Sequence, residues 1–386
     1  MALSEGQFQV KLNGQPLDRN LYVGLIKGFE IRESDRDSVV ASLRFKLAQG
    51  AEGKYTPIDD KIFTPSVPLE IDVASPNKQP VPLFVGFVTH LRPHFERIES
   101  NCYLEVLGMD ASVIMDAEEQ VNTYPDMTDS DAASKIFGKY SLSVTAAKSD
   151  AKHEEKKLLL VQRSTDWKFV QMLARRNGYV CFLQPDKSGT VQANWGPRAV
   201  DKSAQPDLSP QMPNATLTWV DFQTVYKGPV RYIGAAFDPF EKKVVTGDGK
   251  TKLKTLGSGT AVDSDIEGGL KKGGATKAQR LLRDPLPFDQ AINAESTGRT
   301  DDALFVIEAR GEIDTTIYAG LLRAGLPVAI KDVGKEYGGY YYVRQVRTIL
   351  DDKGKLTQTF VAEKNSFGIG SASFGKTQSD TEGGLL

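Results

Sequence analysis

Residues 158–195 carry an ordered set of secondary-structure signals: a helix start, a helix with one apolar face, a helix stop and a hairpin. Ser164 or Thr165 can accept a free backbone N–H of the first turn, and Asp166 lies in that turn, where negative charge is favoured. Apolar side chains at spacings of three and four then share one face, namely Trp167, Val170, Leu173 and Ala174. Asn177-Gly178 is a stop signal, because Gly adopts the left-handed conformation easily. This pattern predicts a packed α/β lobe and contains no obvious catalyst.

Short segments with alternating apolar and polar residues dominate both sides of that stretch, and such alternation is typical of β-strands. The clearest examples are residues 8–12, 38–47, 69–73, 83–91, 101–107, 303–309, 326–333, 340–350 and 355–364. Few helix signals accompany them, which favours small antiparallel barrels or curled sheets.

The predicted fold is therefore mainly β (α+β), with two small antiparallel β-barrel domains flanking a mixed α/β lobe. The four expected parts are a first barrel at 1–116, a lateral lobe at 117–214, a second barrel at 215–365 and a flexible tail at 366–386. Residues 238–300 form an expected loop-rich insertion in the second barrel. Its stretch from Gly247 to Lys277 has few large apolar residues, so we expect it to bury too little surface to order itself.

Composition narrows the class of protein. A chain of 386 residues is long for one core, and its net charge of −2 gives no general signal for nucleic acid or anionic membranes. The N-terminus lacks the pattern of a secretory signal, and no apolar run approaches the length of a membrane span. Cys102 and Cys181 lie in strand-like apolar runs, which favours buried thiols over a disulfide or a metal site. We expect folding in a cytosol-like compartment and no membrane anchor.

The sequence contains one literal phosphate-loop match, Gly370 to Thr377, read as GSASFGKT. A phosphate loop needs a strand before it and a helix after it, and only nine residues follow here. We therefore expect no nucleotide and no other cofactor.

Metal and acid–base chemistry are also unsupported. His90 and His94 would lie about 13 Å apart on a strand, too far to share one ion, and His153 falls in a charged segment without an evident partner. The paired acids at 59–60, 301–302 and 351–352 fall in expected turns, where Asp caps backbone groups. We expect no metal, no catalytic residue and no enzyme.

Three ordered blocks carry a family resemblance. The first block joins residues 69–73 to Leu83-Phe-Val-Gly86-Phe-Val-Thr89 and then to a strand that ends at Asp110. The second block is Gln162-x3-Asp166-Trp167-x-Phe169-Val170, and it continues to Gly178-Tyr179. The third is Ala324-Gly325-x2-Val328-x-Ile330, then Gly339-x-Tyr341-x-Val343, closing at Lys364-Asn365. Together they resemble the phage late-control, or tail baseplate hub, family, which is similar to the central hub of the T4 baseplate and to the hub half of VgrG. One departure is Thr348, which stands where many members place a histidine.

The resemblance implies a homotrimer whose paired barrels form a pseudo-sixfold ring, and it implies that the following residues maintain the fold: Gly86, Asp110, Asp166, Trp167, Gly178, Gly325, Gly339 and Tyr341. Such a ring adapts a hexameric inner tail-tube protein to a trimeric spike, here expected on a separate chain. Cargo or DNA passes the channel without specific binding, so its wall should be mostly polar or charged.

The implied location is a virion or phage-tail-like particle, built in the cytoplasm beside other baseplate proteins. Two alternatives stay open from the sequence. One is a cell-wall-degrading enzyme carried on a tail, which would need an acidic cleft and a carboxylate of raised pKa in the lobe. The other is a carbohydrate-binding module, which would need an aromatic-lined pocket. The sequence does not separate phage, bacteriocin and extracellular or type VI-like injection systems, and it does not identify the cargo.

Overall fold

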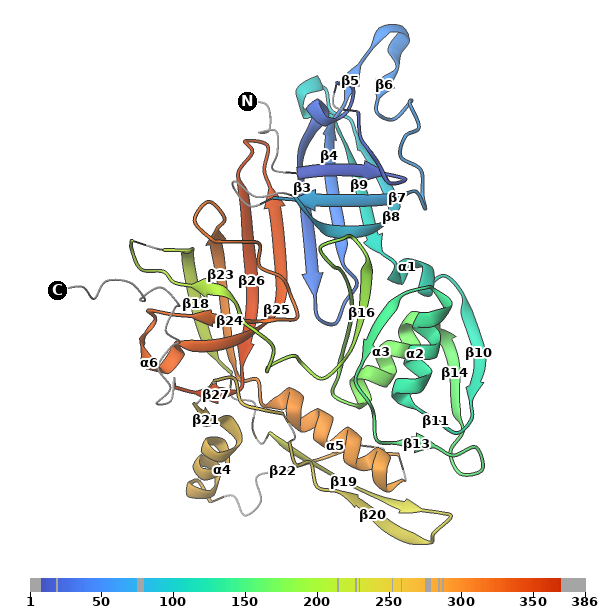
Figure 1. Ribbon diagram of the computed structural model, residues 1–386, viewed down its shortest axis with the longest axis vertical. Coiled ribbons are helices and arrows are strands. Elements are labelled where there is room, and N and C mark those ends of the chain that lie inside the picture. The colour runs from blue at the N-terminus through green and yellow to red at the C-terminus, as the bar shows by residue number, and fades with distance from the viewer. Residues whose placement is uncertain are drawn as a thin grey trace, which may run out of the picture.

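The computed structural model describes residues 8–368 except 19, 75–79, 214, 226–227, 229, 252, 258, 275–278, 284 and 287. One 13-stranded sheet dominates it (Figure 1). Eleven strands follow one another in the order β18 (Leu217–Thr224), β23 (Ile307–Asp314), β26 (Leu356–Lys364), β25 (Gly339–Leu350), β3 (Ile26–Ser34), β4 (Val40–Lys46), β9 (Tyr103–Asp110), β8 (Val81–His94), β7 (Pro68–Val73), β1 (Phe8–Leu12) and β2 (Gln15–Pro16). On β25, β24 (Pro327–Ile330) adds a branch that continues to β17 (Gln205–Leu208).

The expected mainly β character is confirmed, whereas the two closed barrels are not found. No strand pairing among the described residues closes either half on itself. The reason is that residues Phe29 to Ser34 of β3 pair with β25 of the other half, from Gln345↔Ser34 to Leu350↔Phe29. Each half gives one sheet edge to the other, and the result is a continuous open sheet that curls.

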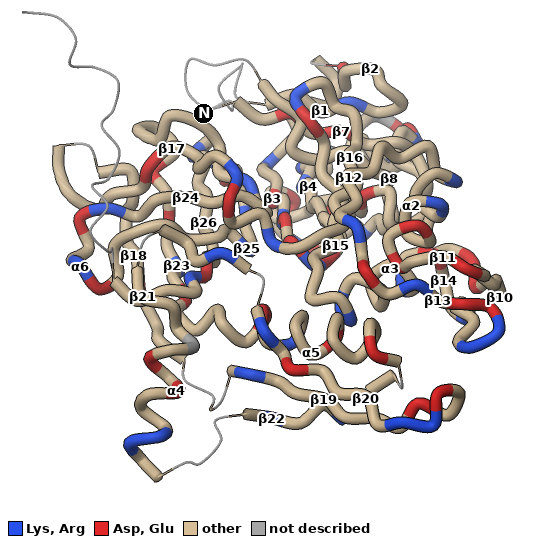
Figure 2. Tube along the Cα trace, turned by 60° about the horizontal axis from the view of Figure 1, so that its bottom comes forward, with Lys and Arg blue, Asp and Glu red and all other residues tan. Residues whose placement is uncertain are grey.

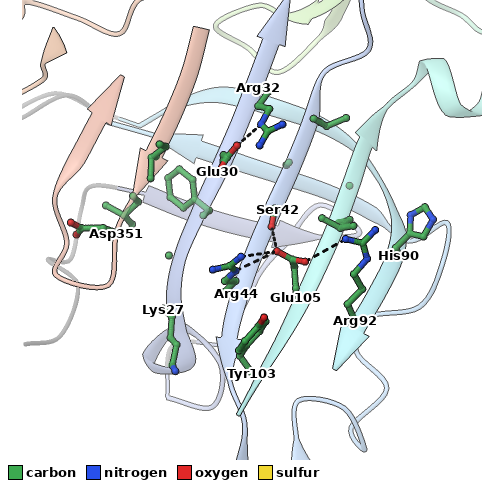
Figure 3. Close-up of a pocket in the computed structure, with 18 of the residues that line it drawn as sticks. Lys27, Glu30, Arg32, Ser42, Arg44, His90, Arg92, Tyr103, Glu105 and Asp351 are labelled. Carbon is green, nitrogen blue, oxygen red and sulfur yellow. Dashed lines mark hydrogen bonds and ion pairs between the residues drawn. The ribbon is translucent and has the colours of Figure 1, made fainter. Parts of the chain in front are cut away.

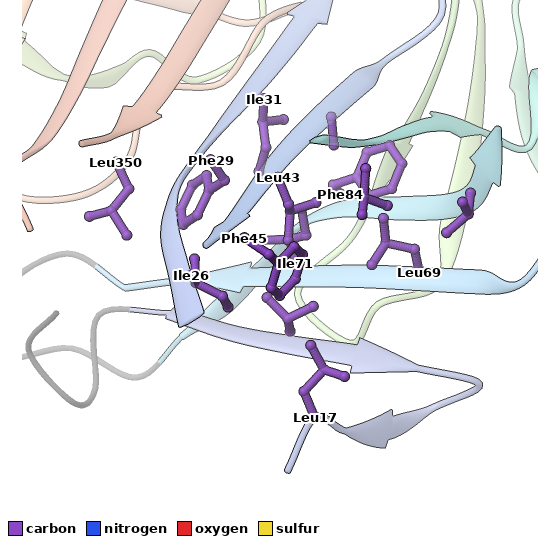
Figure 4. Packing of buried hydrophobic residues seen from close by; sticks show 14 of the residues in the cluster. Leu17, Ile26, Phe29, Ile31, Leu43, Phe45, Leu69, Ile71, Phe84 and Leu350 are labelled. Carbon is purple, nitrogen blue, oxygen red and sulfur yellow. The ribbon is translucent and has the colours of Figure 1, made fainter. Parts of the chain in front are cut away.

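Two separate cores lie under this sheet, one in each half. The first gathers buried side chains of β1, β3, β4, β7, β8 and β9, including Phe29, Phe45 and Phe84 (Figure 4). The second gathers those of β23, β24, β25 and β26, including Tyr341 and Phe360. Strand alternation produces both, since every second side chain of a strand points to the same face. The remaining side chains of these strands face the opposite side.

The lobe follows the first half of the sheet. Its helices are α1 (Ser112–Met115), α2 (Asp129–Lys139) and α3 (Asp166–Arg176). Its strands are β10 (Glu119–Tyr124), β11 (Met127–Thr128), β12 (Ser143–Ala146), β13 (Lys152–His153), β14 (Leu160–Thr165), β15 (Val180–Pro185) and β16 (Val191–Gly196). The predicted helix and hairpin are confirmed: Thr165 caps α3 by accepting the Lys168 N–H, Gly178 has a φ of 68°, and β15 pairs with β16.

His153 has partners, so the expectation of an unpartnered residue in a surface segment was wrong. Its Nε2 lies 2.8 Å from Oδ1 of Asp129, and both side chains are buried. Arg176 Nε donates to the other oxygen of Asp129 at 2.7 Å, and Asn177 Nδ2 donates to it at 2.6 Å. Burial raises the pKa of Asp129, but the bonds from His153 and Arg176 outweigh it and leave this pKa below its ordinary value. The network ties α2 and α3 to β13.

Residues 238–300 are not the loop-rich segment that the composition indicated. More than half of their described residues belong to β19 (Arg231–Asp238), β20 (Lys243–Gly247), β22 (Gln279–Leu281), β21 (Thr260–Ala261), α4 (Val262–Lys272) and α5 (Asp289–Ala303), and the described residues between these elements, such as 239–242 and 248–251, form turns and loops. Two glycines of this segment are positions of close packing. A Cβ on Gly247 would lie 2.6 Å from the Ile292 carbonyl of α5, and one on Gly298 would lie 2.4 Å from the Gly178 nitrogen of the lobe.

The remaining elements are short. They are β5 (Ala48–Gln49), β6 (Tyr55–Thr56), β27 (Ser366–Phe367), α6 (Gly334–Tyr337) and the 3-10 turns Val23–Leu25, Ala51–Gly53 and Glu99–Asn101. Because β27 pairs with β21, the first residues of the expected flexible tail are part of the fold. The phosphate-loop-like segment at 370–377 lies outside the described residues.

Cys102 and Cys181 are buried free thiols, as predicted. None of the helices in the described part of the chain combines the length and the apolar character needed to cross a membrane.

The contact between Gly298 of α5 and Gly178 generates a stability prediction. Gly298→Ala should destabilise the protein by about 1–3 kcal/mol, because the new methyl group would overlap the backbone of the lobe. Gly269→Ala in α4 is the matched control, since no atom lies within 4 Å of its added Cβ. That control should gain up to about 1 kcal/mol from helix propensity. Urea denaturation of both variants measures the difference, and equal midpoints would contradict the packing described here.

Candidate functional site

A concave polar surface lies on the face of the sheet opposite the two cores. It is a depression of about 1010 Å³ over β25, β3, β4, β9 and β8 (Figure 3). In β9, Leu104 and Val106 point to the core, whereas Tyr103 and Glu105 point into the depression. We call this surface the concave face.

Two carboxylates and four arginines of the concave face are paired with one another. Glu105 lies 3.3 Å from Arg44 and 3.7 Å from Arg92, and it accepts the Ser42 hydroxyl at 3.1 Å. Glu30 accepts bonds from Arg32 and, at 2.6 Å, from Arg347 of the other half.

Two carboxylates of this face, Glu105 and Glu30, therefore each lie between two guanidinium groups. Burial raises the pKa of Glu30, but the hydrogen bonds of Arg347 and Arg32 prevail and lower it. A carboxylate held ionised in this way is a poor proton donor at neutral pH. The arrangement forms a charged, internally neutralised wall rather than an acid–base centre.

The polar surface continues across the seam between the two halves. A second depression of about 660 Å³ shares Arg32 and Arg347 with the first and extends to Thr359 and Val361 on β26. Both signs of charge are interspersed along the chain (Figure 2). Since β25 and β3 are hydrogen-bonded neighbours, one wall spans both halves of the molecule.

The residues singled out in the first sequence block lie beside the concave face and not on it. A Cβ on Gly86 would lie 2.2 Å from the Met109 carbonyl, so this glycine lets β8 cross close to β9. Asp110 is buried and accepts the backbone N–H groups of Val39 at 2.7 Å and Ser112 at 3.0 Å. Burial raises its pKa to about 6. Its bonds join β4, β9 and α1.

The second block lies inside the lobe. Asp166 is fully buried at the start of α3, where it accepts bonds from Gln162 at 2.7 Å, Tyr140 at 2.9 Å and Lys139 at 3.1 Å. Trp167 is buried in the lobe's core. Every one of these contacts is internal to the lobe.

The third block lies in the second half. A Cβ on Gly325 would lie 2.5 Å from the ring of Phe182, so this glycine allows the lobe to pack on the second half. Gly339 has a φ of 124° at the start of β25, and the Tyr341 hydroxyl donates to the Tyr337 carbonyl at 2.6 Å. That all eight residues maintain the fold stays a prediction, which substitution would test.

The closing residues of the third block are buried as well. Lys364 donates to the Gly338 carbonyl at 2.8 Å, and burial lowers its pKa to about 8. Asn365 accepts a backbone N–H from the insertion at 2.8 Å and so anchors it to β26. Thr348 is buried and accepts a bond from Gln358 at 2.9 Å, which gives this departure from the family pattern an internal role.

Sequence reasoning missed a buried charge cluster at the meeting point of the two halves, the lobe and the insertion. Glu363 of β26 lies 2.7 Å from Arg344 of β25 and 3.2 Å from Arg198. Asp35 follows β3 and is fully buried behind Arg198 at 3.9 Å. The only local signal was the charged run at 33–37, because most partners in the cluster are more than 150 residues apart in the sequence.

Desolvation dominates at Asp35. Burial raises its pKa to about 6, although Arg198 and two further guanidinium groups oppose the shift. Arg198 also stacks on the Phe305 ring, with its guanidinium carbon 3.9 Å from the ring centroid. Buried polar groups of this kind are costly when one partner is removed.

In the described part of the chain, no arrangement of side chains matches a metal site or the raised-pKa carboxylate expected of a wall-degrading enzyme. His90 is exposed and His94 is half-buried on β8, and no group of three or more metal-binding side chains was found among the described residues. The described carboxyl groups with a raised pKa are Asp35, Asp110 and Glu295, all outside the lobe at 117–214. The enzyme hypothesis placed such a group inside the lobe.

The buried Asp35 generates a pH prediction. Its pKa is higher in the folded than in the unfolded chain, so its contribution to stability is complete below about pH 4 and is lost as the pH rises through about 6. Asp35→Asn removes this titration. The free energy of unfolding of the variant minus that of the unsubstituted chain should therefore be larger at pH 7 than at pH 4, by about 1–3 kcal/mol. Chemical denaturation at both pH values measures the difference, and a difference independent of pH would refute the assignment.

Solved structures with this fold extend over nearly the whole chain. The tail protein of Neisseria meningitidis MC58 superposes with a TM-score of 0.63 at 11% identity, covering 93% of this chain and 96% of that one. The 43 kDa tail protein of prophage MuSo2 from Shewanella oneidensis gives 0.60 at 13% identity, covering 93% and 98%. A type VI secretion component of E. coli, described as similar to T4 bacteriophage tail proteins, gives 0.55 at 12% identity, covering 94% and 79%.

At these identities the likeness establishes the fold, and a phage-tail type of fold was the expectation from the three sequence blocks. No curated protein sequence matches the chain. The family profile described as the Alg8 N-terminal domain matches residues 4–202, slightly more than half of the 386 residues, and its description states no activity. The chain thus belongs to the Alg8 N-terminal domain family.

Proposed function

We propose that this protein is a structural baseplate hub of a contractile tail or injection machine. In this proposal three copies form a ring that adapts a hexameric inner tube to a trimeric spike and lines part of the central channel. The observation that carries the proposal is the concave face, which runs without interruption from one half of the molecule to the other. The fold shared with tail proteins of two bacteria supports it.

The chemistry of the concave face suits the wall of a channel. DNA or protein that moves through a channel binds to large exposed apolar surfaces and dissociates easily from polar ones. The apolar members of the face, such as Val40, Leu107 and Ile349, are partly buried, whereas Arg32, Arg44 and Arg92 are exposed. The pairing of Glu30 and Glu105 with four arginines reduces the capacity of those groups to bind DNA or protein cargo.

The two cores support the proposed symmetry. Each half of the sheet curls over its own core, so one chain supplies two tube-like units and three chains supply six. The division proposed from the sequence, with units at 1–116 and 215–365 and a lateral lobe at 117–214, suits this arrangement. The lobe would then lie outside the ring and be available to other baseplate proteins.

Further elements of the proposal concern location and partners. Assembly would take place in the cytoplasm, and the finished hub would be part of a virion or phage-tail-like particle. The spike would be a separate chain. The role is structural, without a cofactor, and no arrangement seen among the described residues favours the wall-degrading or carbohydrate-binding alternatives.

The first test is the oligomeric state. The purified full-length chain should have the mass of a trimer by size-exclusion chromatography with multi-angle light scattering. It should also bind the ring of the inner tube protein from the same particle in a co-sedimentation assay, because three chains with two units each match six tube subunits. A chain that stays monomeric and binds neither tube nor spike would refute the hub proposal.

A further inference from the structure

A polar pocket lies where the two halves, the lobe and α5 meet, away from the residues that form the concave face. Its volume of about 360 Å³ falls in the range of about 300–1,000 Å³ that is typical of small-ligand sites. Figure 1 shows α5 between the large sheet and the β19–β20 hairpin, and the pocket borders this helix. Its wall includes five arginines from different parts of the chain, namely Arg36, Arg198, Arg280, Arg299 and Arg344. We call it the arginine pocket.

Three of these arginines have buried N–H donors without an acceptor. Arg198 is only 6% exposed and forms an ion pair with Glu363, yet its Nε and Nη1 donate no hydrogen bond to any described residue. The Nε groups of Arg36 and Arg344 are also buried and have no acceptor among the described residues. Buried donors of this kind are costly, and an ion bound beside them is one of the few ways to satisfy them.

The carboxylates of the pocket do not use these donors. They are Asp302, Glu308 and Glu363. Each accepts a hydrogen bond of 2.5–2.7 Å from an arginine, in the pairs Asp302–Arg36, Glu363–Arg344 and Glu308–Arg310. These pairings reduce the repulsion that the carboxylates would exert on an anion, while the Nε groups of the pocket remain available.

Arg299 adds a positive charge at the opening of the pocket. It lies on α5, its side chain is exposed, and it forms no ion pair within 4 Å in the part of the chain that the structure describes. An exposed guanidinium group beside buried ones attracts anions from solvent toward the buried donors.

We infer that the arginine pocket binds a phosphate-type oxyanion, which Arg198 and Arg299 hold together with the Nε groups of Arg36 and Arg344. Guanidinium groups bind phosphate through several N–H donors at once. A tetrahedral oxyanion offers acceptor atoms in every direction, as donors from four separate chain segments require, whereas a carboxylate offers two oxygens in one plane. The inference does not depend on the hub proposal. The phosphate is either the free ion or a phosphate group of nucleic acid.

Isothermal titration calorimetry of the full-length chain with sodium phosphate, at constant ionic strength, tests the site. We expect saturable binding of one ion per chain. The melting temperature should rise with phosphate concentration, because the folded chain alone has the site. Titration with a short thymidine oligonucleotide without a terminal phosphate distinguishes the two sources. Binding of the oligonucleotide identifies nucleic acid as the source, and binding of inorganic phosphate alone identifies the free ion.

Two variants should change the affinity in opposite directions, which a purely structural role of these residues does not predict. Arg299→Ala should weaken binding at least about tenfold, because a charged donor is lost. Asp302→Asn should strengthen it, because an opposing charge is removed while an oxygen stays available to Arg36. Arg163→Ala is the matched control, since Arg163 is an exposed arginine of β14 outside the pocket.

Melting curves without phosphate verify that all three variants fold. Saturable binding with the two opposite changes supports the site for either source. Absence of saturable binding of both ligands would overturn the inference. It would also be overturned if Arg299→Ala bound as tightly as Arg163→Ala. Either result would leave the hub proposal intact.

Discussion

The pairing of β25 with β3 is the interaction on which the rest of the structure depends. It joins strands that are more than 300 residues apart and turns two curled half-sheets into one. Without it each half would expose a long strand edge to solvent, which favours association with wrong partners. The salt bridge of Arg347 on β25 with Glu30 on β3 crosses the same seam on the concave side.

The buried charge cluster lies at the end of this seam and extends the connection to the other parts of the molecule. Arg344 of β25 and Glu363 of β26 meet Arg198, which follows β16 of the lobe. Arg36 pairs with Asp302 of α5 at 2.5 Å. These residues are mutually dependent, since removal of one partner leaves a buried charge uncompensated. The cluster therefore adds a shared contact between the halves, the lobe and α5 to the pairing of β25 with β3.

Local elements were predictable from the sequence, and their long-range pairing was not. The helix at 166–176 and the hairpin after it follow from capping and periodicity, which act over a few residues. The seam between β25 and β3 leaves no local trace, because the alternation that identifies a strand does not identify the strand with which it pairs. The insertion was misread for a related reason: Gly247 and Gly298 are close-packing positions, and a single sequence does not distinguish these from loop glycines.

The candidate site shows the same division. The eight residues chosen from the family pattern lie at strand crossings and in cores, where geometry restricts residue type, whereas the concave face consists of ordinary exposed strand residues such as Arg44 and Glu105. Only the continuity of the sheet makes those residues a wall.

The most direct test of this account is a cryo-electron microscopy map of the assembled oligomer. The account predicts that the concave face over β25, β3, β4 and β9 points toward the central axis and lines the channel. A map in which that face points outward, or in which β25 and β3 are separated, would contradict it.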